Sequence, residues 1–212
     1  MNDTAALIAR LSAGGIGALK PHLLPDAPLL PRVPTNPEHV LFPGVDPDRE
    51  LAPAAVLVGV VQRNEPTLLF TERTADLPRH AGQISFPGGR AQDSDVSLIQ
   101  TALRETEEET GITADFVSIA GFLDPHTIGS GYAILPVVGV LREGFTLRAD
   151  PREVANVFEV PLAFLLDPAN VRRESREFNG RTRSFYSFTY EHRYIWGATA
   201  AMLVNFFERL RT

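Results

Sequence analysis

Residues 54–61 form a nearly continuous apolar run that is rich in valine. A strand with apolar side chains at successive positions has no face left for water, so it belongs in a sheet that is covered on both sides. A turn is predicted at 64–66 and a returning strand at 67–73. We therefore expect the compact part of the chain to begin near Ala54 and to be built around this strand.

The rest of the compact part alternates between strand and helix patterns. Further strands are predicted at 83–86, 116–123, 133–141, 154–160 and, as a pair, at 184–196. Helices are predicted at 95–110, 161–166 and 198–210. Strands mixed with a few helices favour an α/β sandwich with a mixed sheet.

The first 53 residues have a different character. A short amphipathic helix is predicted over the first twelve residues, and nine of the 17 prolines lie between Pro21 and Pro53. Proline fixes φ and donates no backbone hydrogen bond, so this stretch is predicted to be an extended arm. Its leucines are expected to lie along the surface of the compact part. We therefore divide the chain into a helix and proline-rich arm, 1–53, and a domain, 54–212.

Composition narrows the function classes. The 212 residues include no cysteine, which excludes disulfide scaffolds, thiol nucleophiles and iron–sulfur clusters. The formal charge of −6 argues against partners such as nucleic acid or an anionic membrane, which need a basic surface. No apolar run approaches the roughly 18 residues of a membrane span, and no secretory leader is evident. We expect a cytoplasmic protein, and a homodimer is compatible with the sequence.

A predicted helix carries three glutamates on one face. They are Glu105, Glu108 and Glu109, and the opposite core stripe is formed by Ile99, Ala102, Leu103 and Thr106. Like charges at this spacing repel by a few tenths of a kcal/mol per pair unless a cation lies between them. Mg²⁺ or Mn²⁺ prefers carboxylate oxygens and would relieve this repulsion. The alternative interpretation is an acidic face that is simply solvated.

The segment from Gly89 to Ile112 resembles the box of the Nudix hydrolase family, G-x5-E-x7-R-E-U-x-E-E-x-G-U, where U is a bulky aliphatic residue. The half from Arg104 to Gly111 keeps the charged residues and the glycine. Asp95 replaces the first glutamate, with one extra residue before Arg104, and Thr106 replaces an aliphatic residue. Asp95 is therefore also a candidate for the helix cap.

The resemblance implies a Nudix-type α/β/α sandwich, a Nudix hydrolase domain at 54–212, and metal-dependent cleavage of a nucleoside diphosphate linked to another moiety. It implies that Glu105 and Glu109 ligate the metal, with Glu108 as a third ligand or a base. The Gly88 or Gly89 carbonyl can also contribute. Arg104 is expected to hold a glutamate through a bidentate contact.

A second pattern lies upstream of the box. Residues 68–74, Arg79 and the segment from Gly82 to Gly89 are similar to the signature of the coenzyme A pyrophosphatase branch of this family. The resemblance implies hydrolysis of coenzyme A to 4′-phosphopantetheine and adenosine 3′,5′-bisphosphate. Arg73 and Arg79 are the candidate phosphate-binding residues, because guanidinium groups match phosphate oxygens, and Gly88 completes the substrate loop.

Several alternatives stay open at this point. The general base is Glu105 or Glu108 within the helix, or Glu153 or Glu159 after it. The substrate alternative is ADP-ribose, NADH or a nucleoside triphosphate. A non-catalytic nucleotide-binding Nudix module is the third reading; such modules usually lose a box glutamate, whereas all three are present here.

Overall fold

The computed structural model describes residues 16–31, 50–76, 81–178 and 181–211, together with residues 6, 8, 9 and 12. The predicted N-terminal helix is only partly within these ranges. Arg79 and residues 32–49 of the arm lie outside them.

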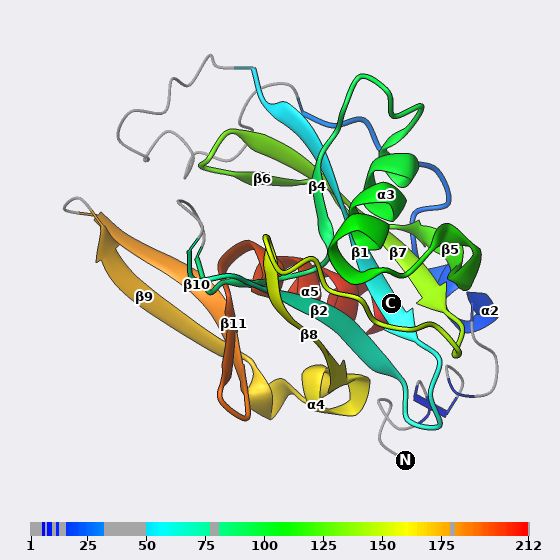
Figure 1. Ribbon diagram of the computed structural model, residues 1–212. Helices are drawn as coiled ribbons and strands as arrows, with labels where there is room; N and C mark the ends of the chain where they lie inside the picture. Colours follow the sequence, from blue (N-terminus) through cyan, green and yellow to red (C-terminus); the bar gives the residue numbers. More distant parts are fainter. Residues whose placement is uncertain are drawn as a thin grey trace.

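A mixed sheet forms the centre of the molecule (Figure 1). Its eight strands are β1 (Ala52–Val61), β2 (Thr67–Arg73), β3 (Ile84–Ser85), β4 (Gly88–Arg90), β5 (Val117–Phe122), β6 (His126–Ile128), β7 (Tyr132–Leu141) and β8 (Val154–Pro161). The central strand β1 pairs in parallel with β7 and antiparallel with β2 and β4. The expected mixed sheet is confirmed, but Gly88 and Gly89, which the sequence suggested as a loop, belong to a short strand.

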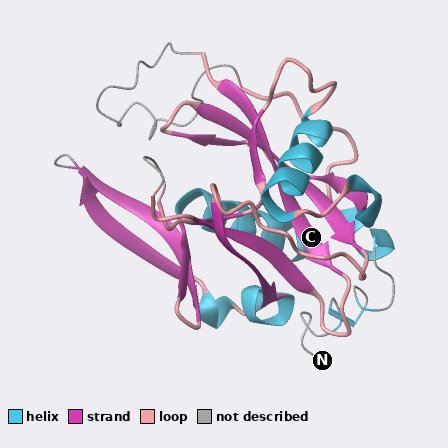
Figure 2. Cartoon of the chain, viewed as in Figure 1, coloured by secondary structure: helices cyan, strands magenta, loops and turns pink. Residues whose placement is uncertain are grey.

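Helices cover both faces of this sheet (Figure 2). They are α2 (Ile16–Leu19), α3 (Leu98–Thr110), α4 (Leu162–Leu166) and α5 (Gly197–Arg211), with single 3-10 turns at Lys20–His22, Ala114–Phe116 and Pro168–Asn170. Leu57 of β1 shares a core with Ala102 of α3, whereas its neighbour Val58 shares the other core with Phe206 of α5. Successive residues of β1 thus face different helix layers, which explains why the run is apolar throughout. No helix in the described ranges is long and apolar enough to cross a membrane.

A second, antiparallel sheet extends from the main one. It consists of β9 (Arg172–Phe178), β10 (Arg181–Tyr190) and β11 (Arg193–Trp196) in the order β11-β10-β9. The sequence predicted β10 and β11 as a strand pair. It missed β9, whose residues are mostly charged and lack the apolar alternation by which strands are recognised.

The described part of the N-terminal arm lies on the main sheet. Leu24 and Phe122 of β5 exchange two backbone hydrogen bonds of 3.0 Å, and Leu23 is buried in the core shared with α5. Leu30 also packs on the domain, whereas Leu29 is 96% exposed, contrary to expectation. The division of the chain at residue 53 stays a prediction.

Candidate active site

Local sequence signals set the ends of α3. The Ser97 side chain caps the first turn by accepting a hydrogen bond from the Gln100 backbone N–H (3.2 Å). Gly111, at φ 77°, ends the helix in the left-handed conformation that favours glycine. The suggested capping role of Asp95 is therefore wrong, because Ser97 occupies that position.

The inward face of α3 is partly polar. Ala102 and Thr106 are buried as the sequence predicted. Glu109 is buried as well, although the sequence placed it on the face opposite the core stripe. Leu103, which was expected in the core, is only partly buried and lines a groove on the outer side of the helix. Because the helix buries small residues against β1 and β4, its glutamates lie close to the backbone of the sheet.

The two glycines of β4 meet two of these glutamates. A Cβ atom on Gly89 would lie 2.4 Å from a carboxylate oxygen of Glu105, so only glycine leaves that carboxylate its place. The Gly88 backbone N–H donates a hydrogen bond of 3.3 Å to Oε2 of Glu109. The structure therefore brings Glu105, Glu109 and both predicted loop glycines together.

Negative charge at this place is poorly compensated. Burial raises the pKa of Glu109 to about 8; the Gly88 N–H and the charge of Arg73 oppose this shift, and the charges of Glu105 and Glu153 add to it. Burial also raises the pKa of Glu105, despite the nearby Arg104 guanidinium. A buried carboxylate, Glu109, and a partly buried one, Glu105, both with raised pKa values, form a site that a bound cation would stabilise.

Arg104 forms the polar network beside these groups. Its guanidinium makes a bidentate contact with Asp95 (2.9 Å for both nitrogen–oxygen pairs) and single contacts with Glu105 (2.8 Å) and Glu108 (3.1 Å). The bidentate partner is thus Asp95 rather than the glutamate that the sequence suggested. Asp95 accepts hydrogen bonds from Arg104 and from the Gln92 N–H; the first has the larger effect, and together they hold the pKa of Asp95 well below its usual range. Asp95 therefore fixes the arginine that contacts two box glutamates.

The donor set fits a hard cation at Glu105 and Glu109. Carboxylates next to a glycine backbone are the oxygen ligands that Mg²⁺ and Mn²⁺ prefer. Glu108 differs, because its side chain is 57% exposed and its carboxylate is bound to Arg104. Within the described ranges, no three acidic or histidine side chains already converge on one point. A third ligand from Glu108 would require this side chain to leave Arg104.

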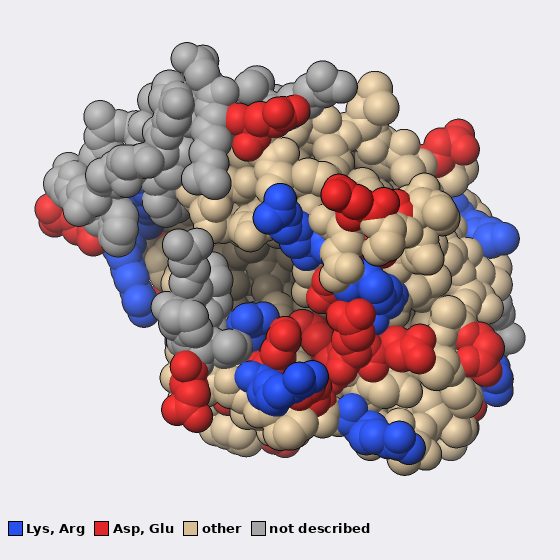
Figure 3. Space-filling view, turned by 45° about the horizontal axis from the view of Figure 1, so that its top comes forward, with Lys and Arg blue, Asp and Glu red and all other residues tan. Residues whose placement is uncertain are grey.

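Of the remaining predicted residues, some lie near Glu105 and Glu109 and others lie away from them. Arg73 ends β2, its charge lowers the pKa of Glu109, and its buried Nε has no hydrogen-bond partner among the described residues. The charge of Glu153 acts on both Glu105 and Glu109. Figure 3 shows acidic and basic side chains meeting beside a hollow in the surface.

Glu159 is placed elsewhere. Its carboxylate forms an ion pair with Arg63 (2.7 Å) and accepts a hydrogen bond from Thr67 at the start of β2. Burial alone would raise the pKa of Glu159, but the hydrogen bonds from Arg63 and Thr67 outweigh it and the pKa is lowered. Among the candidate bases, Glu105 lies against Gly89, Glu108 is bound to Arg104, and Glu159 belongs to the separate ion pair with Arg63.

Residues 51–182 match the protein family described as "NUDIX domain". The chain therefore belongs to the Nudix family, and the expected Nudix-type sandwich is confirmed. Relatives from Photorhabdus laumondii subsp. laumondii and Yersinia enterocolitica, both described as "Uncharacterized Nudix hydrolase NudL", are 42% and 43% identical over 150 residues. These alignments cover 71% of this chain and 80% and 77% of the relatives. The C. elegans Ap4A hydrolase in a binary complex aligns with a TM-score of 0.45 and 22% identity, over 51% of this chain and 80% of that one.

Proposed function

We propose that this Nudix pyrophosphohydrolase acts on coenzyme A or its derivatives with Mg²⁺ or Mn²⁺. It cleaves the diphosphate to give 4′-phosphopantetheine and adenosine 3′,5′-bisphosphate. The observation that carries the proposal is the glutamate pair, the buried Glu109 and the partly buried Glu105, which lies against Gly88 and Gly89 near the arginine at the end of β2. The sequence signature that ends at these glycines supports coenzyme A as the substrate.

The glutamate pair would hold the metal. A divalent ion bound there lowers the pKa of water and neutralises diphosphate oxygens. Glu105 and Glu109 supply the negative charge, Gly89 provides the space for Glu105, and Asp95 orients Arg104 against Glu105. Each of these contributions is a positioning or charge effect that can be removed separately.

A carboxylate must also accept the proton of the attacking water. Glu153 is the favoured base, because its charge reaches both glutamates of the pair without an ion pair of its own among the described contacts. Glu105 and Glu108 remain candidates, but both contact Arg104. Glu159 is the weakest, since its pairing with Arg63 makes its carboxylate less basic.

Arg73 would contact the diphosphate. A buried guanidinium nitrogen without a hydrogen-bond partner in the described part of the chain is costly, and a phosphate oxygen would satisfy it. Arg79, which precedes the same glycines in sequence, stays a proposed second contact.

The test is hydrolysis of a panel containing coenzyme A, 3′-dephosphocoenzyme A, ADP-ribose, NADH and a nucleoside triphosphate. Products are identified by mass spectrometry with Mg²⁺ or Mn²⁺, and Glu105→Gln is the control for contaminating activity. We expect coenzyme A to give the highest kcat/KM. Preferred cleavage of ADP-ribose, NADH or the triphosphate would establish the alternative substrate, and nucleotide binding without hydrolysis of any compound would establish a non-catalytic module.

A further inference from the structure

The β9–β11 sheet has one face in the core and one face outside it. Phe188 of β10 and Ile195 of β11 are fully buried in the core shared with α5. Because side chains alternate along a strand, the alternate residues of β10 and β11, and the residues of β9 that pair with them, form the opposite face. We call this the β9–β11 outer face; it comprises Arg172, Glu174, Arg176, Arg183, Phe185, Ser187, Thr189, Tyr194 and Trp196.

Aromatic rings form the centre of this face. Trp196 stacks on Tyr194 (centroids 6.4 Å apart) and meets Phe185 edge to face (5.6 Å). The Arg176 guanidinium lies 5.6 Å from the Phe185 ring and 6.0 Å from the Trp196 ring. Rings fixed in this way offer a stacking surface for another flat aromatic group at small entropic cost.

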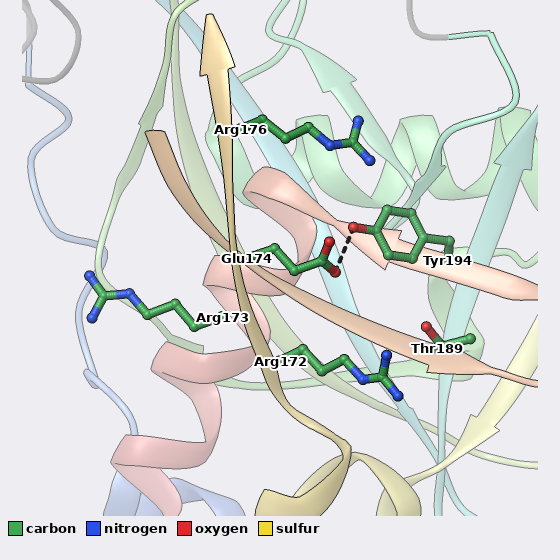
Figure 4. A pocket seen from close by; sticks show the side chains of 6 residues that line it. All are labelled: Arg172, Arg173, Glu174, Arg176, Thr189 and Tyr194. Atoms are coloured by element: carbon green, nitrogen blue, oxygen red, sulfur yellow. Dashed lines mark hydrogen bonds between the residues drawn. The ribbon is translucent and has the colours of Figure 1, made fainter. Parts of the chain in front are cut away.

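Arginines border the rings. Arg172 and Arg176 are exposed and flank Glu174, whose carboxylate accepts hydrogen bonds from Ser187 and Tyr194 (2.8 Å for Tyr194). An open groove of about 780 Å³ lies over these residues (Figure 4). Three arginines accompany one glutamate on this face, although the chain as a whole carries a charge of −6. The face therefore suits a ligand that is both aromatic and anionic.

This face is also close to the candidate active site. β11 lies against β3, and the Thr199 hydroxyl, three residues after Trp196, donates to the Ile84 carbonyl (3.1 Å). Gly88 follows Ser85 by three residues, which span at most about 10 Å. One extended substrate can therefore reach both places.

We propose that the β9–β11 outer face binds the phosphorylated nucleoside end of the substrate. The base packs on the rings of Tyr194 and Trp196, and a phosphate monoester is bound by Arg172 and Arg176. The proposal rests on the proposed function, because coenzyme A carries an adenine and a 3′-phosphate on one side of the diphosphate that is cleaved.

Trp196 is the only tryptophan of the chain, so its fluorescence reports directly on this face. We expect adenosine 3′,5′-bisphosphate to change the fluorescence saturably and AMP, which lacks the second phosphate, to bind more weakly. The double variant Arg172→Ala/Arg176→Ala should raise the Kd of the bisphosphate at least tenfold and reduce the difference from AMP. Arg142→Ala is the control for the loss of an exposed arginine, because Arg142 follows the end of β7 and does not line the groove.

Equal Kd values for the wild type, the double variant and the control would overturn the proposal, as would the absence of any fluorescence change together with no heat of binding. Thermal melting checks folding, and Arg172→Gln/Arg176→Gln keeps part of the aliphatic stems if the alanine variant is unstable.

Kinetics separates this proposal from the proposed function. If coenzyme A is the substrate, the double variant should raise its KM at least tenfold with kcat changed less than twofold. Coenzyme A hydrolysis that is unaffected by the double variant contradicts the assignment of this face but not the proposed function. Arginine-dependent binding of the bisphosphate without coenzyme A hydrolysis supports the face and contradicts the proposed function.

Discussion

Two arginine-centred networks lie near opposite ends of β1. Arg63, two residues after the end of β1, binds Glu159 and Glu143. Arg104 binds Asp95, Glu105 and Glu108. It also donates a hydrogen bond to the backbone carbonyl of Arg90, which pairs with the beginning of β1. Both sets combine one guanidinium with several carboxylates. Their electrostatics differ at the glutamates: the pKa of Glu159 is lowered, as is that of Asp95, whereas the pKa values of Glu105 and of its neighbour Glu109 are raised.

This difference distinguishes a structural ion pair from a candidate catalytic carboxylate. At Glu159 each carboxylate oxygen already has a donor, so folding has completed the site. At Glu109 the Gly88 N–H is the one hydrogen-bond donor among the described residues, at 3.3 Å, and a bound cation would lower the free energy of this buried carboxylate. Perturbed carboxylates that folding leaves uncompensated mark functional sites more reliably than the number of ion pairs.

Removing a carboxylate charge should lower kcat most at the glutamate pair, Glu105 and Glu109. Glu105→Gln and Glu109→Gln each remove a ligand charge and should lower kcat about 10²- to 10⁴-fold with the fold retained, because metal catalysis depends on that charge. Glu159→Gln is the matched control and should change kcat less than about threefold. Steady-state kinetics on each purified variant, with circular dichroism for folding, checks this. A loss at Glu159→Gln as large as that at Glu109→Gln would remove the distinction between the two networks.

The two glycines sharpen the same distinction. Gly89→Ala places a methyl group against the end of the flexible Glu105 side chain, so we expect kcat to fall at least tenfold with little change in melting temperature. Gly88→Ala meets backbone atoms of Ala55 and Val56 at 2.3 and 2.5 Å, and its φ of 152° disfavours a side chain. This second variant should lose about 2–4 kcal/mol of stability, as strained and overpacked sites do. Melting curves and steady-state kinetics of both variants test these expectations. A fully active Gly89→Ala would contradict the close contact between Gly89 and the Glu105 carboxylate.

The contributions of Glu109 and Glu159 to the free energy of unfolding should change with pH in opposite directions. The pKa of Glu109 in the folded metal-free protein, about 8, lies above its unfolded value near 4.5, so the folded state holds an extra proton between these pH values. The free energy of unfolding should then fall as pH rises through this window, by up to about 1.4 kcal/mol per pH unit from this group. Glu159, with a lowered pKa, contributes stability that is present above pH 4.5 and lost as pH falls below it.

Chemical denaturation of the metal-free protein between pH 5 and 8 measures this effect. Glu109→Gln should flatten the slope, whereas Glu159→Gln should leave it. A slope that is the same in Glu109→Gln as in the wild type would show that the buried carboxylate is not its source.

The smallest effect is expected at Arg63. Arg63→Ala removes the ion pair with Glu159 and should lower the free energy of unfolding by about 1–2 kcal/mol, because charged hydrogen bonds at a partly exposed position contribute modestly. Activity should stay within about twofold of the wild type. Thermal melting and kinetics check both; a much larger loss of activity than of stability would connect this network to catalysis.

The sequence predicted the elements whose pattern is local. Strand β1 followed from its apolar run, and α3 from its glutamates and its terminal glycine. It missed β9, because an exposed edge strand needs no apolar alternation, and it placed Leu103 in the core, because a helical pattern does not show how wide the buried stripe is. It placed Arg104 beside a glutamate, as the structure does, but it expected the bidentate contact there, whereas the chain turns at residues 91–97 so that Asp95 takes it. Contacts between segments, such as Gly88 with Glu109, depend on the sheet register, which sequence alone does not contain.

We propose that Glu105 and Glu109, rather than the acidic residues of the Arg63 network, hold the metal. Mn²⁺ titration followed by electron paramagnetic resonance of the free ion tests it most directly, using the wild type, Glu105→Gln/Glu109→Gln and Glu159→Gln. We expect saturable Mn²⁺ binding in the wild type and in Glu159→Gln, and at least a 100-fold weaker affinity in the double variant. Undiminished Mn²⁺ affinity in Glu105→Gln/Glu109→Gln would contradict it.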